Sequence, residues 1–269
     1  MKRALLVALL TFLVVAPALA QPNQPDVLPK EFACMSGQTK HASKFWLTKG
    51  KCVSKCLANF WRGYEPQESN CLPPYGGTTA LCVNDTGLGV KGAENKFETA
   101  VMKVCVTGPG ADCPECYAPD GCGLGPTQDF VQAQEGQLDS FIPDIFCERA
   151  EADKAEQKCQ LNTAKVLTRY FRTRHKCYTS CFIDERSGGT PALCLVPATA
   201  EKALECLATA KQKAVVAIDK YCDETLLPGA LPDCGGYPNG ASWTNLIDAV
   251  VDAMINPTFC ASPSVAFVD

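Results

Sequence analysis

The cysteines of this chain occur twice in nearly the same order. Three of them recur with the same spacing at a constant offset of 125 residues: Cys34, Cys52 and Cys56, then Cys159, Cys177 and Cys181. The intervening residues also match, since Phe45-Trp46 aligns with Tyr170-Phe171. A repeated pattern predicts repeated structural units, and two copies are too few for a solenoid. We therefore expect two like domains in tandem, residues 21–147 and residues 148–269.

The first twenty residues predict a secretory signal peptide. Lys2 and Arg3 form a basic head, residues 4–15 are an apolar run, and Ala18-Leu19-Ala20 supplies small residues before Gln21. No later segment is long and apolar enough to span a bilayer. We expect a secreted protein, extracellular or periplasmic, with no transmembrane anchor after signal cleavage.

All 18 cysteines follow the predicted cleavage point. An even number of cysteines in an oxidising compartment predicts a disulfide framework. Removal of Lys2 and Arg3 with the signal peptide changes the net charge from −4 to −6. That balance argues against a nucleic-acid or anionic-membrane surface.

Residues 148–176 predict one long helix, because the segment is rich in Ala, Glu, Lys and Arg and contains no Gly or Pro. The matching first-half segment contains Gly37 and Gly50, which predict a weaker helix. Further helices are expected at 91–104, 127–141, 198–221 and 242–255, with Ser242 as an N-cap. Alternating β-type runs are absent. The predicted fold class is mostly α, with two tandem homologous disulfide-rich domains of about three helices each and long loops clipped by cysteines.

An antiparallel hairpin of the first two helices in each domain predicts most of the disulfide bonds. The expected pairs are Cys34–Cys105, Cys56–Cys82, Cys113–Cys147, Cys116–Cys122, Cys159–Cys222, Cys181–Cys194 and Cys234–Cys260. The remaining four cysteines pair as Cys52–Cys71 and Cys177–Cys206, or across the halves as Cys52–Cys177 and Cys71–Cys206. The Cys177–Cys206 bond meets an objection, since Cys206 lies about 160° round a helix from Cys222.

Two sequence features could carry redox or metal chemistry. Cys113-Pro-Glu-Cys116 has the spacing of a redox or metal motif, but no βαβ pattern surrounds it, and we favour a structural bridge. His41 is expected to be a buried core residue, and His175 a surface residue near a helix end. No catalytic residue, cofactor site or metal site is predicted.

A basic cluster recurs in both halves. Its members are Arg169, Arg172, Arg174 and Lys176, and Lys40, Lys44, Lys49 and Lys51. The cluster could bind an acidic glycan, a phosphate or a partner. We favour a solvated helix face whose cations complement the helix macrodipole. The paired aromatic residues are expected to lie in the core.

The leading functional hypothesis is a secreted, non-enzymatic binding or structural protein stapled by disulfides, whose partner is an unknown protein, glycan or apolar ligand. The second is a carrier of lipid or a small apolar ligand in a cavity between amphipathic helices. Its expected lining is Val166, Tyr170, Leu207 and Ile218. The third is a hydrolase that uses carboxylates in loops.

Overall fold

The computed structural model describes residues 29–84, 92–114, 117, 120–146, 153–186, 191–222 and 239–259, and the predicted signal peptide lies outside them. Within these residues the chain forms helices and no strand. The α-helices are α1 (Pro29–Phe60), α2 (Gly77–Val83), α3 (Ala93–Met102), α4 (Leu124–Ile145), α5 (Lys154–Arg186), α6 (Glu201–Asp219) and α7 (Gly240–Thr258). Short turns of other helix types are η1 (Glu68–Cys71), η2 (Lys103–Thr107) and η4 (Pro191–Cys194). The mostly helical fold class is confirmed.

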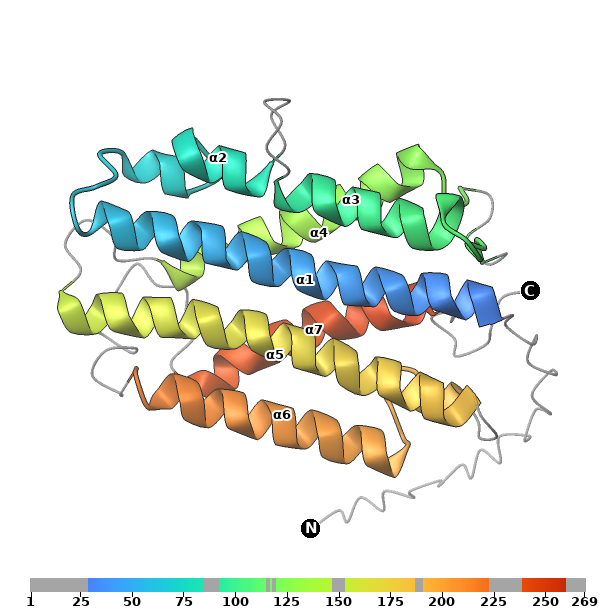
Figure 1. Cartoon of the computed structure of the whole chain (residues 1–269). Coiled ribbons are helices and arrows are strands. Elements are labelled where there is room, and N and C mark those ends of the chain that lie inside the picture. Colours follow the sequence, from blue (N-terminus) through green and yellow to red (C-terminus); the bar gives the residue numbers. More distant parts are fainter. Residues whose placement is uncertain are drawn as a thin grey trace, which may run out of the picture.

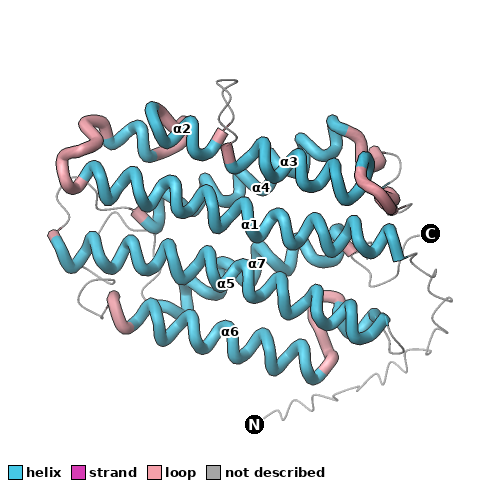
Figure 2. The backbone as a smooth tube through the Cα atoms, in the orientation of Figure 1, coloured by secondary structure: helices cyan, strands magenta, loops and turns pink. Residues whose placement is uncertain are grey.

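The helices form two layers, with α3, α1, α5 and α6 side by side in one and α4 and α7 crossing behind them (Figure 1). The described segments that connect the helices lie at the ends of the bundle (Figure 2). The central pair, α1 and α5, is antiparallel, because Thr39 contacts Thr179 near one end and Gly50 lies against Thr168 nearer the other. One face of the α1–α5 pair therefore packs on α4 and α7, while no described helix covers its opposite face.

The hydrophobic core is a single cluster to which both halves of the chain contribute. At its centre the ring of Trp46 stacks on that of Phe171, with 3.8 Å between centroids and an interplanar angle of 6°. These two residues are 125 positions apart, so they are equivalent in the repeated pattern. The expectation that the paired aromatic residues are core residues is confirmed, since Phe45 and Tyr170 are buried as well. The division into tandem domains at residue 147 remains a prediction.

The helix predictions were right in kind and imprecise at the ends. Helix α5 continues ten residues beyond the expected end at Lys176. Gly37 and Gly50 do not interrupt α1. Each stands where a neighbouring element approaches closely, which explains why glycine occupies the position. A Cβ atom on Gly50 would lie 2.7 Å from the Thr168 methyl carbon. Ser242 is not the N-cap of α7, since the side chain of Asn239 accepts the hydrogen bond from the Ser242 amide.

Three of the observed disulfides are pairs that the antiparallel hairpin predicts: Cys34–Cys105, Cys159–Cys222 and Cys181–Cys194. A fourth, Cys177–Cys206, is one of the two pairings that the sequence left open. The alternative bonds across the halves, Cys52–Cys177 and Cys71–Cys206, are wrong. The angular objection did not prevent the Cys177–Cys206 bond, which forms together with Cys159–Cys222 between α5 and the segment from α6 to the turn after Asp219.

Two expected pairs are exchanged. Cys52 bonds to Cys82, and Cys56 bonds to Cys71, in place of Cys52–Cys71 and Cys56–Cys82. The chain folds back after α1, so η1 meets the end of α1 first and α2 lies beside an earlier turn. The three bonds are nested in the same way in each half: the first cysteine pairs with the last, the second with the one before it, and the third with the nearest. In this pattern Cys71 corresponds to Cys194.

The expected bonds Cys113–Cys147 and Cys116–Cys122 are also wrong, because Cys113 bonds to Cys122. The two cysteines are 9 residues apart, and their Cα atoms lie 5.7 Å from each other. The chain turns back between them through Gly121, whose φ is +70°. Cys116, Cys147 and the expected Cys234–Cys260 bond lie outside the described residues. Disulfides in this number are typical of extracellular proteins.

Candidate functional site

The cations of α1 and α5 divide into an inward and an outward set. Lys49 and Arg174, both members of the predicted basic cluster, are buried. The outward cations are exposed: Lys40, Lys44, Lys51, Arg169, Arg172 and Lys176 of the predicted cluster, with Lys55, Lys154, Lys158 and Lys165. The prediction of one solvated basic face was therefore wrong for the two inward residues.

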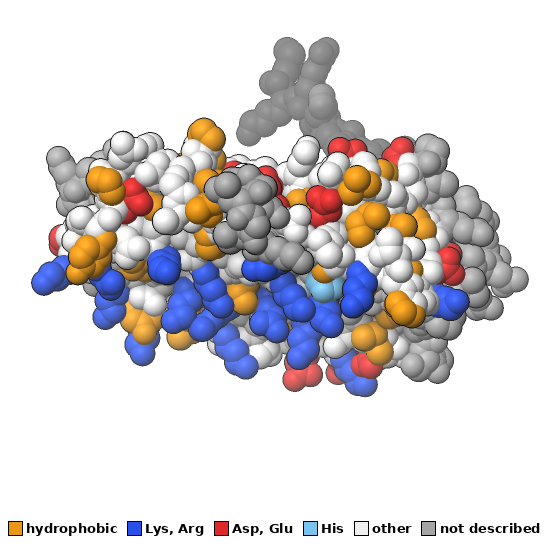
Figure 3. Space-filling model, turned by 45° about the horizontal axis from the view of Figure 1, so that its top comes forward, with side chains coloured by type: hydrophobic (Ala, Val, Ile, Leu, Met, Phe, Trp, Pro, Cys, Tyr) orange, Lys and Arg blue, Asp and Glu red, His pale blue; other side chains and the backbone are white. Residues whose placement is uncertain are grey.

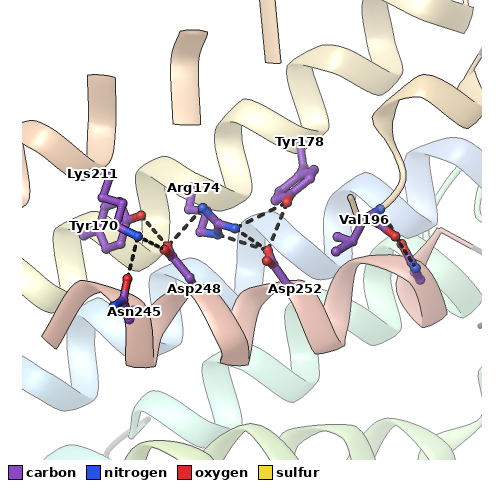
Figure 4. A network of polar contacts seen from close by, with 9 residues as sticks. Tyr170, Arg174, Tyr178, Val196, Lys211, Asn245, Asp248 and Asp252 are labelled. Atoms are coloured by element: carbon purple, nitrogen blue, oxygen red, sulfur yellow. Dashed lines mark hydrogen bonds and ion pairs between the residues drawn. The ribbon is translucent and has the colours of Figure 1, made fainter. Parts of the chain in front are cut away.

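The inward cations bind carboxylates of the second layer. Lys49 Nζ lies 2.5 Å from Glu135 and 2.8 Å from Asp139, both on α4. Arg174 pairs with Asp248 at 3.0 Å and with Asp252 at 2.5 Å, both on α7 (Figure 4). A buried ion pair is costly to break, since the remaining charge loses its partner, so these contacts fasten α4 and α7 to the central helices.

The inward pairs have equivalent positions in the two halves, because Arg174 lies 125 residues after Lys49. On each partner helix the two acids are four residues apart, so they share one face. The sequence signal that predicts these pairs is the combination of a repeated cation with a repeated acidic i,i+4 pair. Tyrosines complete both clusters: Tyr75 donates to Asp139, and Tyr178 donates to Asp252 at 2.9 Å.

The Lys49 cluster also contains a carboxyl pair. Burial, followed by the hydrogen bond and charge of Glu135, raises the pKa of Glu94 to about 8. For Glu135 burial acts in the same direction, but hydrogen bonds with Glu94 and Lys49 outweigh it and hold the pKa below its ordinary value. Glu94 therefore keeps a proton at neutral pH while Glu135 is a carboxylate that neutralises Lys49.

The outward cations form a band along α1 and α5 with few acidic side chains among them (Figure 3). No acidic residue occurs between Phe32 and Phe60 or between Gln157 and Ile183. Within the described part of the chain none of the outward cations makes an ion pair. The band is therefore an unneutralised positive surface on a chain whose net charge is −4.

Two grooves lie along the seam between α1 and α5, with volumes of about 530 and 480 Å³, inside the usual range for ligand sites. We name the first the Lys165 groove; its cations are Lys51, Lys154, Lys158, Lys165 and Arg169. We name the second the His175 groove; its charged and imidazole side chains are Lys40, His41, Lys44, Arg172, His175 and Lys176. Hydroxyl side chains line both grooves, and amide side chains line the Lys165 groove.

His175 is buried in the wall of the groove that bears its name, with 2% of its surface exposed. The prediction of a surface histidine was wrong, because α5 continues past it and packs against α1. Neither ring nitrogen has a hydrogen-bond partner among the residues that the structure describes. Burial, with the charge of Arg174 adding to it, lowers the pKa of His175 to about 3, so the ring is neutral.

His41 also lines the His175 groove, and it is half-buried rather than a core residue as expected. Burial lowers its pKa, and the charges of Lys44 and Lys40 add to this effect. The sequence pattern misplaced both histidines because helical phase alone does not reveal where α1 and α5 leave a gap.

The cysteine motif does not supply thiol chemistry in the described part of the chain. Cys113 is oxidised, so it cannot form a redox pair with Cys116. The sulfur atoms of Cys34, Cys105 and Cys122 lie within 4.8 Å of one another, but all three belong to disulfides. Metal binding requires a thiolate, which a disulfide sulfur is not.

The side chains expected to line an apolar cavity line neither groove. Tyr170, Leu207 and Ile218 are buried in the core cluster, and Val166 packs against it.

None of the described helices has the length and apolar character that crossing a membrane requires. Comparison of the chain with protein-family models, with curated proteins and with solved structures finds no significant match.

Proposed function

We propose that the chain is a secreted, non-enzymatic binding protein, stapled by disulfides, whose binding surface is the basic face of α1 and α5 and whose ligand is anionic. The observation that carries the proposal is the set of exposed cations that make no ion pair among the described residues, on two adjacent helices with no acidic residue between Phe32 and Phe60 or between Gln157 and Ile183. Surfaces that serve only solubility mix charges of both signs.

The cost of this arrangement supports a functional origin. Five like-charged pairs stand at i,i+4 spacing: Lys40/Lys44, Lys51/Lys55, Lys154/Lys158, Lys165/Arg169 and Arg172/Lys176. Such pairs destabilise a helix by about 0.2–0.5 kcal/mol each. The helix macrodipole does not offset this repulsion at the start of α5. Lys154 and Lys158 stand in the first turns of that helix, where positive charge is unfavourable. An anionic ligand would remove the repulsion.

The carrier and hydrolase hypotheses have less support. The residues expected to line an apolar cavity fill the core instead. The perturbed carboxyl groups, Glu94 and Glu135, lie on helices, and Glu135 neutralises Lys49. They line neither groove. We therefore assign them a structural role, in which Glu135 fastens α4 to α1 and Glu94 joins α3 to α4.

The first experiment is retention of the mature protein on immobilised dextran sulfate at pH 7.5. A chain of net charge −6 with mixed surface charges would pass through the column. We expect retention, and elution by salt, because polyanion binding releases counterions and weakens steeply with ionic strength. Absence of retention at low salt would refute the proposal.

Two variants of equal net charge locate the binding surface. The central variant replaces Lys44, Lys51, Arg169 and Arg172 with Gln. The matched control replaces Lys96, Lys103, Lys202 and Lys213, which are exposed on other helices or turns. The central variant should elute at much lower salt than the control. Equal elution would show that net charge, and not this face, determines retention.

A further inference from the structure

The two grooves are lined by equivalent residues of the repeated pattern. Adding 125 to Lys40, Ser43 and Lys44 of the His175 groove gives Lys165, Thr168 and Arg169 of the Lys165 groove. On the other wall, Lys176 of the His175 groove corresponds in the same way to Lys51 of the Lys165 groove. The grooves are thus two versions of one arrangement of cations and hydroxyl groups.

The equivalent residues lie on opposite sides of a centre, because α1 and α5 are antiparallel and meet where Trp46 stacks on Phe171. The grooves therefore lie end to end along one seam. Their α1 walls extend from Ala33 to Ser54, which at 1.5 Å per residue is about 32 Å. A linear ligand of that length would contact both grooves at once.

The lining selects the chemistry of the ligand. The exposed cations of both grooves suit sulfate or carboxylate groups, whereas the buried hydroxyls of Ser43 and Thr168 donate to carbonyls of their own helices. The nearby aromatic rings, Trp46 and Phe171, are buried and offer no platform on which a base could stack. The one large exposed apolar side chain in either groove is Ile183, which is too little to anchor a membrane.

We propose, resting on the proposed function above, that the two grooves are subsites for one linear acidic polysaccharide that runs along the α1–α5 seam. Occupation of one groove places the rest of the chain beside the other, so the second contact forms at a high effective concentration. His175 distinguishes the subsites, because Gly50 stands at the equivalent position. Its ring lines the His175 groove and narrows the space that glycine leaves open in the Lys165 groove.

The test is calorimetric titration with sulfated linear oligosaccharides of increasing length. An oligosaccharide of about 15 Å, which fills one groove, should bind with two molecules per protein. An oligosaccharide of about 30 Å should bind with one molecule per protein and at least tenfold more tightly. Two long molecules per protein, each with the affinity of the short one, would show that the grooves act separately and would overturn the proposal.

Single-groove variants provide the second measurement. One replaces Lys40, Lys44, Arg172 and Lys176 with Gln; the other replaces Lys51, Lys158, Lys165 and Arg169. Each should reduce the short oligosaccharide to one molecule per protein and lower the affinity of the long one to about that of the short one. The matched control variant should change neither value. A single-groove variant that binds the long oligosaccharide as tightly as the control would also overturn the proposal.

Other polyanions separate this inference from the proposed function. The probes are a single-stranded oligonucleotide of equal charge and phosphatidylglycerol vesicles. Tighter binding of either probe would overturn the assignment to a polysaccharide while leaving an anion-binding face. If no polyanion binds, the proposed function itself fails. Carboxylated polygalacturonate in place of the sulfated series shows which acidic group the grooves prefer.

Discussion

At the scale of single residues, His175 is the most unusual side chain of the described structure. It is a buried polar ring without a hydrogen-bond partner, which costs about 1–3 kcal/mol relative to a satisfied group. Its ring lies 4.4 Å from that of Phe171, so the core supports it by packing alone. The ring also lines the His175 groove, so the unsatisfied group lies beside the candidate binding surface.

Burial of His175 makes stability depend on pH. The unfolded chain binds a proton near pH 6.5, but the folded chain does not until about pH 3, so stability falls as pH decreases between these values. The slope is at most about 1.4 kcal/mol per pH unit. We expect His175→Phe, which keeps a ring against Phe171, to flatten this acid limb in urea unfolding from pH 4 to 8.

Glu94 changes the pH dependence of stability in the opposite direction. The effect of His175 is therefore measured as the difference between wild type and His175→Phe. Its pKa is about 8 in the folded state and 4.5 ordinarily, so its contribution to stability is lost as pH rises between these values. This contribution is the same with and without the His175 change and cancels in the difference. His41→Val, whose valine occupies the equivalent position at Val166, measures separately the contribution of His41, because the pKa of that histidine is also lowered. If the free energy of unfolding varied equally with pH in wild type and in His175→Phe, the predicted effect of burying His175 would be wrong.

At the scale of helices, the charge pattern of α1 and α5 gives a prediction that separates ligand binding from a structural role. The central variant removes one member from each of four like-charged i,i+4 pairs. We expect it to raise the free energy of unfolding by about 1–2 kcal/mol at low salt, because each pair costs a few tenths. The gain should disappear near 1 M salt, where charges are screened.

The matched control variant should show no such gain, because its lysines are not members of those pairs. If the outward cations stabilised the fold through contacts of their own, the central variant would instead be less stable than wild type. Urea unfolding at two salt concentrations measures both outcomes.

The helices themselves were largely predictable, because apolar periodicity and helix propensity act locally. The bond Cys159–Cys222 was predictable for a related reason, since it follows from an antiparallel hairpin. The exchange of Cys71 with Cys82 was not, because it depends on how the chain folds back after α1. The inward direction of Lys49 was missed, although the repeated cation and the acidic i,i+4 pair on α4 carry a sequence signal for it.

At the scale of the whole molecule, the two halves form one core around the Trp46–Phe171 stack. The sequence repeat predicts two domains, whereas a shared core predicts that each half needs the other half to fold stably. Each half alone would expose the inner face of α1 or α5, including a large aromatic ring that is almost fully buried in the intact chain. Exposure of a side chain of that size costs about 1.5–3 kcal/mol.

Separate expression of residues 21–147 and 148–269 therefore tests how the halves depend on each other. We expect each half to be unstable as a monomer and to be stabilised on mixing, because α1 and α5 can then restore the seam. Size-exclusion chromatography with circular dichroism of each half, and of the mixture, measures this. Two stable monomers that do not associate would favour independent domains instead. In that case the two grooves would not be held in line along one seam, and a polysaccharide could not depend on both at once.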